Sequence, residues 1–188
     1  MLSTRRDQTG VTLVEILIAL ALIAILTVIA VPAYSTFLQN SQIRNAAESI
    51  VNGMQIARAE SVRRNASSQV VIGPGSGWIV SLPSSGTQVQ QRSAAEGSAS
   101  VVVVINDLDA DGAADDAADR ITFNGMGWRV ANGDGSALIS QIDFSNPAGG
   151  TCKHVDDGPM RCLRLLVQPA GAVRMCDPAV AAGDPRAC

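Results

Sequence analysis

The sequence is poor in the residue types on which most enzyme active sites and nucleic-acid surfaces depend. It has one histidine and only six aromatic residues, namely three Phe, two Trp and one Tyr. It contains neither a Gly-x-Ser-x-Gly nor a His-Glu-x-x-His motif, which argues against an enzyme. Its 14 basic and 17 acidic residues give a net charge of −3. That balance argues against a dominant nucleic-acid or anionic-lipid surface and leaves room only for a local basic patch. With few aromatics, the globular part should have a marginal core that needs covalent staples.

One long apolar run stands out against this background. From Val11 to Val31, 18 of 21 residues are apolar, and a helix of that length spans roughly 30 Å, the thickness of a bilayer's hydrocarbon core. A secretory signal peptide would have a shorter apolar region and a small-residue cleavage site after it. Arg5 and Arg6 precede the run, so the positive-inside rule keeps the N-terminus cytoplasmic. The pattern predicts a single-pass anchor with one modest domain outside the membrane.

Two features go beyond an ordinary anchor. Glu15 places a carboxylate inside the apolar run, where a charge costs roughly 2.5–3.5 kcal/mol and needs a partner. Gly10 separates a polar leader from the helix. The string Gly10-Val11-Thr12-Leu13-Val14-Glu15 resembles the class III signal of type IV prepilins. The resemblance implies that a prepilin peptidase cuts after Gly10 and methylates the new amine of Val11, and that this amine neutralises Glu15 of the same or a neighbouring subunit. The alternative is a chance Gly and a misplaced Glu in a plain anchor.

The helix is expected to continue beyond the membrane. Pro32 should kink it, dividing a transmembrane half (11–33) from an amphipathic half (34–65) that ends at Arg64-Asn65. The stripe predicted to cover a sheet of the same chain has spacings of three and four: Ile43, Ala47, Ile50, Met54, Ala57 and Ser61. The residues expected to lie away from it are Arg44, Glu48, Asn52, Gln55 and Arg63.

After Asn65, short β-like runs alternate with turn residues through 66–188. They predict an α+β fold, with one antiparallel sheet packed on the long helix. The segment Gly73–Gly77 lacks a following Lys-Ser/Thr and helix, so it predicts a turn and not a phosphate loop. The candidate strands are Gln69–Ile72, Trp78–Leu82, Thr87–Gln91, Ser100–Ile105, Ile121–Asn124, Trp128–Ala131, Ala137–Phe144, Leu163–Gln168 and Ala172–Cys176.

An acidic stretch is the one candidate metal site. Alternating aspartates before Gly112 match the first half of a calcium loop, but Ala118 stands where a bidentate Glu is expected. Asp116 or Asp119 could substitute for that Glu. A calcium site and a solvated acidic hairpin loop are therefore the two interpretations, and no other cofactor is expected. The candidate ligands are Asp107, Asp109, Asp111 and Asp116.

Four cysteines lie in the last 37 residues. Export favours disulfides, and with no Cys-x-x-Cys pair and only His154 nearby, a zinc site is not expected. His154 itself is expected to be solvated in a polar loop. The preferred pairing is Cys152–Cys162 with Cys176–Cys188, since each closes a short loop. Cys162–Cys176 with Cys152–Cys188 is the rival, because the first two flank a predicted hairpin.

The helix end, Gln55 to Asn65, and the tail Val173-Arg174-Met175-Cys176-Asp177-Pro178 resemble the GspH/FimT branch of minor pilins and pseudopilins. The resemblance implies a pilin-like fold and a structural subunit, not an enzyme. Its location would be the bacterial inner membrane, with a periplasmic C-terminal domain. Its expected partners are other pilins through the N-terminal helix, the prepilin peptidase and the inner-membrane assembly platform. The segment from Thr151 to Cys188, here called the stapled tail because disulfides are expected to close it, and the low mass of the chain favour a minor subunit of an initiation or tip complex. A type IV pilus and a type II secretion pseudopilus fit the sequence equally.

Some FimT-type proteins bind DNA through a Gly-Arg-x-Arg element, which makes a DNA receptor the alternative function. The matching positions here run from Gly171 to Arg174 and lack one arginine. The tail from Thr151 to Cys188 has five cations against four aspartates, and a net charge of +1 is thin support for phosphate binding. The candidate DNA contacts are Arg161, Arg164 and Arg174.

Overall fold

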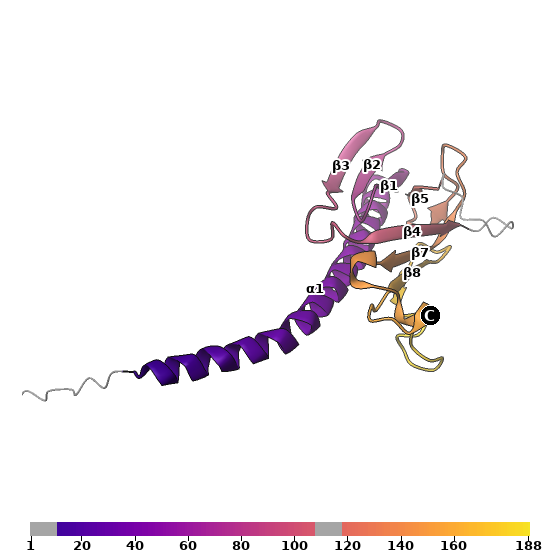
Figure 1. Ribbon diagram of the computed structural model, residues 1–188. Coiled ribbons are helices and arrows are strands. Elements are labelled where there is room, and N and C mark those ends of the chain that lie inside the picture. The colour runs from indigo at the N-terminus through magenta and orange to yellow at the C-terminus, as the bar shows by residue number, and fades with distance from the viewer. Residues whose placement is uncertain (1–10, 108–117) are drawn as a thin grey trace, which may run out of the picture. The chain divides into compact units, whose positions relative to one another are not determined.

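The computed structural model describes residues 11–107 and 118–188, and α1 and most of its strands are labelled in Figure 1. The chain forms two compact units, one ending at Ser35 and one formed by Thr36–Cys188. Helix α1 (Leu13–Arg64, 52 residues) runs through Pro32 without ending there. Proline removes one backbone donor but does not stop a helix whose neighbouring turns are intact. The long N-terminal helix predicted from the sequence is confirmed.

The C-terminal end of α1 is closed by a Schellman motif at the residue where the sequence predicts the helix to stop. Asn65 adopts a left-handed conformation, with φ of 48°. Its N–H donates to the carbonyl of Val62 at 3.2 Å, and the N–H of Ala66 donates to that of Ser61 at 3.1 Å. These two bonds satisfy carbonyls that the last turn would otherwise leave without partners.

The predicted apolar stripe of α1 is the buried face of the helix. All six of its residues, from Ile43 to Ser61, are 0–1% exposed. The five polar residues expected on the opposite face, from Arg44 to Arg63, are exposed. Helical periodicity thus identifies the packing face of the part of α1 that belongs to the second unit.

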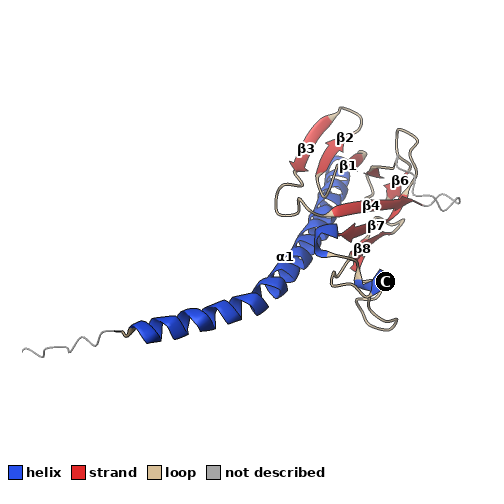
Figure 2. Ribbon diagram, in the orientation of Figure 1, coloured by secondary structure: helices blue, strands red, loops and turns tan. Residues whose placement is uncertain are grey.

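The predicted α+β fold, a long helix packed on antiparallel β-structure, is confirmed, although the strands form two antiparallel sheets where one was expected. Strand β1 pairs with β2 and with the distant β5, whereas β4 pairs with β7, and no strand joins the two ladders. The five-stranded sheet has the order β3-β2-β1-β5-β6, and the four-stranded sheet β4-β7-β8-β9. Figure 2 shows the strands of both sheets in red. Their bounds are β1 Ser68–Ile72, β2 Trp78–Leu82, β3 Thr87–Arg92, β4 Val102–Asp107, β5 Arg120–Phe123, β6 Arg129–Val130, β7 Ile139–Ser145, β8 Leu163–Val167 and β9 Val173–Cys176.

The core contains three of the six aromatic side chains. Phe123 and Phe144 are fully buried, and Trp78 is 2% exposed. The indole of Trp78 packs against Gly53 of α1, where an added Cβ would lie 2.8 Å from a ring carbon. Its Nε1 donates to Ser49 Oγ at 2.8 Å, so the ring is buried with its polar atom satisfied. A glycine in mid-helix therefore allows α1 to approach β2 closely.

Two short helical segments were not predicted from the sequence. A 3-10 turn covers Pro147–Gly149, and α2 covers Lys153–Asp156. His154, which was expected in a polar loop, is an exposed residue of α2. The turn predicted at Gly73–Gly77 is confirmed, with the N–H of Gly73 donating to the carbonyl of Gly77 at 2.8 Å.

Candidate functional site

The apolar part of α1 exposes its side chains on every face. Each side chain described between Val11 and Ser35 is exposed, and the segment is long and apolar enough to cross a membrane. Such a surface is costly in water, so it needs lipid or other apolar helices around it. The first unit is therefore a surface for a membrane or for neighbouring helices.

Thr12 and Glu15 form a capping box at the start of this helix. The N–H of Glu15 donates to Thr12 Oγ1, and the N–H of Thr12 donates to Glu15 Oε2, both at 3.3 Å. The Thr12 hydroxyl also lies 3.3 Å from the same carboxylate oxygen. This is the reciprocal Thr-x-x-Glu arrangement that satisfies free N–H groups of a first helical turn. Glu15 thus has a local partner that the sequence analysis did not identify.

Gly10 lies outside the described residues, and Val11 immediately precedes the cap with its side chain 68% exposed. Cleavage after Gly10 would create an amine at Val11, next to the positive end of the α1 dipole. A cation there is unfavourable unless a carboxylate is close by, and Glu15 is the acidic residue of the first turn. The site therefore favours an acid at position 15 both before and after cleavage.

The tail is held by two disulfides, Cys152–Cys162 and Cys176–Cys188, with Cα–Cα distances of 5.5 and 5.1 Å. This is the pairing preferred from loop length. In the β8–β9 hairpin, Cys176 lies opposite Arg164, so Cys162 is two residues out of register with it. That offset explains why the rival pairing across the hairpin is not formed.

The three tail arginines do not form a free cationic surface. Arg164 binds Asp143 through two hydrogen bonds of 2.7 and 3.2 Å. Arg174 donates to the carbonyls of Ala187 and Pro185 at 2.7 and 3.4 Å. Only the guanidinium of Arg161 has no partner within the described chain. Two of the three side chains are committed to holding β7 and the tail in place.

The acidic residues of the tail are also engaged. Asp184 pairs with Arg186 at 2.9 Å, and the hydrogen bond from Arg186 lowers the pKa of Asp184 to about 2. Asp177 is nearly buried and accepts a hydrogen bond from the N–H of Ala179.

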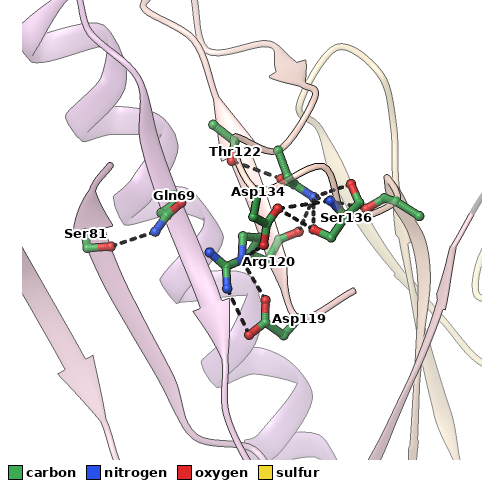
Figure 3. Close-up of polar contacts among 9 residues, drawn as sticks. Gln69, Ser81, Asp119, Arg120, Thr122, Asp134 and Ser136 are labelled. Carbon is green, nitrogen blue, oxygen red and sulfur yellow. Dashed lines mark hydrogen bonds and ion pairs between the residues drawn. The ribbon is translucent and has the colours of Figure 1, made fainter. Parts of the chain in front are cut away.

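A partly buried polar cluster beside β5, shown in Figure 3, was not predicted from the sequence. Arg120 lies between Asp119 and Asp134, with its Nε 2.7 and 2.9 Å from their oxygens. Asn132 is 5% exposed; its Oδ1 accepts from Thr122 Oγ1 at 3.0 Å, and its Nδ2 donates to the carbonyl of Ala137 at 3.0 Å. The sequence signal for this cluster is the turn-like string Asn-Gly-Asp-Gly at 132–135, whose Asn132 and Asp134 make the hydrogen bonds and the ion pair that hold the loop.

Arg129 was also missed, and it joins the two sheets. Its Nη1 donates to the carbonyls of Ile139 in β7 and Val167 in β8, at 2.5 and 3.1 Å. Burial lowers the pKa of this guanidinium. The contacts of Arg129 and of the Asn132 cluster are made within the chain, so their role is structural.

The predicted calcium ligands cannot be placed together. Asp109, Asp111 and Asp116 lie outside the described residues, and Asp107 is the last residue of β4. Within residues 11–107 and 118–188, no group of His, Cys, Asp or Glu is arranged to hold a metal ion. Asp119 is engaged by Arg120, so calcium binding remains a prediction from the sequence.

Comparisons with known proteins give two family matches. The model described as type II transport protein GspH matches residues 46–171, about two thirds of the chain. The model described as the prokaryotic N-terminal methylation motif matches residues 5–31. No curated protein matches the chain.

Two solved structures resemble the chain, both crystal forms of the type IV minor pilin FimU from Pseudomonas aeruginosa. The P21 form is 15% identical, with a TM-score of 0.46, covering 74% of this chain and 91% of the other. The P65 form is 14% identical, with a TM-score of 0.43, covering 70% and 90%.

Proposed function

We propose a role for this chain that starts from its family: it belongs to the GspH family of type II transport proteins. The proposed role is that of a minor subunit in the initiation or tip complex of a pilus or pseudopilus. As a member of this family it is a pilin-type structural subunit and not an enzyme. The match to the methylation motif, over residues 5–31, covers the second half of the leader and the whole apolar run. Prepilin peptidase is accordingly its processing enzyme.

The observation that carries the proposal is the uncovered apolar part of α1 directly after Gly10. A helix with exposed apolar side chains from Val11 to Ser35 fits first a bilayer and then a bundle of similar helices. Arg5 and Arg6 support an orientation with the leader in the cytoplasm and Thr36–Cys188 in the periplasm. Oxidised cysteines in the second unit agree with that compartment.

A role in the initiation or tip complex is supported by the stapled tail and the low mass of the chain. The family description favours the type II secretion system over the type IV pilus, and the genes beside this one decide between them. DNA reception has weaker support, because Arg164 and Arg174 are engaged within the chain.

Processing at Gly10 is the direct test. In cells that contain prepilin peptidase, the intact mass of the chain should show loss of Met1–Gly10 and addition of a methyl group at Val11. Gly10→Val should block both changes, because a side chain there obstructs the peptidase. Ser3→Val, within the same leader, is the matched control and should be processed like the parent. An unprocessed parent chain in such cells would contradict the proposal.

A further inference from the structure

A groove of about 430 Å³ lies between the start of the second unit's helix and the stapled tail. One wall is the α1 segment that contains Phe37, Asn40, Ser41 and Arg44. The other wall comes from the two disulfide-closed segments and the strands between them: Arg161, Leu163, Met175, Cys176, Asp177 and Arg186. None of the sequence motifs points to this groove, because its walls are more than a hundred residues apart in the chain.

The polar lining of the groove is predominantly cationic. Three guanidinium groups line it, those of Arg44, Arg161 and Arg186, against the single carboxylate of Asp177. The guanidinium of Arg186 is paired with Asp184, just outside the lining, whereas that of Arg161 has no partner within the described chain. Arg44 pairs with Glu48 in a contact where both side chains are more than half exposed, and such surface pairs contribute little and exchange partners readily. The groove therefore suits an anionic group that can accept hydrogen bonds from arginine.

Apart from Asn40 and Ser41, the rest of the lining is apolar. Phe37 is 65% exposed, and Leu163 and Met175 lie on the opposite wall. An exposed phenyl ring beside arginines is a poor surface for a free inorganic anion. It is a suitable surface for a ligand that joins an anionic head to an apolar body.

The position of the groove along the chain indicates where such a ligand would come from. Phe37 follows Val31, the end of the apolar run, by six positions in the sequence, a rise of about 9 Å along a helix. Tyr34 lies between them and is 63% exposed. Aromatic and basic residues at this distance from a membrane span are typical of the headgroup layer.

The walls are fixed to one another before any ligand binds. The N–H of Arg161 donates to Asn40 Oδ1 at 2.7 Å, which joins the tail to α1. The disulfide Cys152–Cys162 closes the segment that ends beside Arg161, and Cys176–Cys188 closes the segment that contains Arg186. A fixed pair of walls lowers the ordering cost of binding.

We propose that this groove binds the headgroup of an anionic phospholipid, with Arg161 as its main phosphate contact. The inference rests on the proposed function, since it requires the apolar run to be in a membrane. Duplex DNA fits the groove less well, because DNA binding needs a row of cations along the phosphate backbone. The neighbouring Arg164 and Arg174 are engaged elsewhere.

The test uses the full chain, purified in mild detergent and examined by native mass spectrometry. The chain is given equal amounts of phosphatidylglycerol and phosphatidylcholine with the same acyl chains. The parent should retain phosphatidylglycerol preferentially, and Arg161→Gln should reduce that preference about fivefold, the attraction expected from one basic residue at a membrane surface. Arg63→Gln is the matched control. Arg63 is a similarly exposed arginine at the other end of α1, and its loss should leave the preference unchanged.

Three results would overturn the inference: equal retention of both lipids, an equal effect of the two substitutions, or displacement of the lipid by glycerol 3-phosphate or a short DNA duplex. Flotation of the parent with phosphatidylcholine vesicles separates this failure from failure of the proposed function. A chain that floats without a headgroup preference contradicts only the groove. A chain that does not float contradicts the membrane anchor as well.

Discussion

At the scale of single residues, two partners compete for Glu15. The first is Thr12, which holds the carboxylate in the capping box. The second is the amine that cleavage after Gly10 would create at Val11, in this subunit or in a neighbour. A hydroxyl and an N–H solvate a carboxylate but leave its charge, whereas an amine neutralises it in lipid. The cap is therefore sufficient for one subunit, and the amine becomes important when subunits assemble.

Glu15→Leu separates these roles. Leucine suits lipid better than a carboxylate, so retention of the chain in the membrane should be equal or higher. Docking with partner pilins should fall, because a neighbouring amine would lose its counter-charge. Both effects can be read by membrane fractionation and by co-purification with tagged partner pilins.

Thr12→Ala is the control for this experiment. It removes the cap, at a cost of about 1 kcal/mol to the first turn, but keeps the carboxylate, so co-purification should stay close to that of the parent. If Glu15→Leu also co-purifies like the parent, the charge-pairing hypothesis is wrong.

At the scale of elements, the contact between α1 and β2 depends on Gly53. Alanine is normally favoured over glycine in a helix by about 1 kcal/mol. At this position the added Cβ would lie 2.8 Å from the indole of Trp78, which is fixed by its bond to Ser49. We expect Gly53→Ala to lower the free energy of unfolding by about 1–3 kcal/mol, the usual effect of overpacking a core. Urea denaturation of residues 36–188 measures it.

Asn52→Ala is the matched control, because Asn52 is the preceding residue of α1 and is exposed. It should leave stability unchanged or raise it by a few tenths of a kcal/mol, as expected from helix propensity. A stabilised Gly53→Ala would show that α1 and β2 are not in close contact in solution.

The last turn of α1 should make stability depend on acid pH. Glu60 binds Arg63 at 2.6 Å and also Arg64. The hydrogen bonds from these two arginines lower its pKa from 4.5 to about 2. Between pH 4.5 and 2 the unfolded state therefore binds more protons than the folded state, so this contribution is complete above about pH 4.5 and is lost as the pH falls toward 2. Glu60→Gln should be less stable than the parent at pH 6, and the gap should close by pH 2.

Glu48→Gln is the comparison for that series of thermal denaturation curves. Glu48 forms an ion pair with Arg44 in the same helix, but both side chains are exposed, so its loss should change stability little at any pH. A gap between Glu60→Gln and the parent that stays constant from pH 6 to 2 would rule out the charged contact as its source.

At the scale of the whole molecule, the sequence predicts what depends on local pattern. The period of α1, the stop at Asn65 and all nine described strands follow from the spacing of apolar residues and from turn signals. The division into two sheets does not, because it depends on β1 pairing with β5 across about fifty residues. Turn signals show where a strand ends but not which strand lies beside it.

The candidate sites divide in the same way. The short disulfide loops are local patterns, and their predicted pairing is confirmed. Gly10 and Glu15 also belong to a local pattern, and their roles stay predictions. The partners of Arg164 and Arg174 and the walls of the groove come from distant segments. A count of charges could not show that Asp143 neutralises Arg164.

Because Arg164 and Arg174 already have partners within the chain, we expect little binding to DNA. Residues 34–188 should bind duplex DNA weakly or not at all, with a dissociation constant no lower than the roughly 10⁻⁴–10⁻⁶ M of non-specific contacts. Any binding should weaken with salt as counterions are released, and should be insensitive to base sequence. Mobility shifts at low and physiological salt measure this.

Arg161→Ala and Arg174→Ala distinguish a free cation from an engaged one in the same assay. Residual binding should depend more on Arg161, whose guanidinium has no partner within the described chain. Tight, salt-sensitive binding that is abolished by Arg174→Ala would make DNA capture the leading function.

The burial of Trp78 also has a spectroscopic consequence. Trp78 is 2% exposed and Trp128 is 57% exposed, and the chain has no other tryptophan. The first should emit at shorter wavelength and resist quenching by acrylamide, while the second should emit like an indole in water. Trp128→Phe would leave Trp78 as the single tryptophan, placed where β2 meets Gly53 of α1. Its emission would then report, without any added label, whether the helix stays on the sheet while the subunit leaves the membrane for the filament.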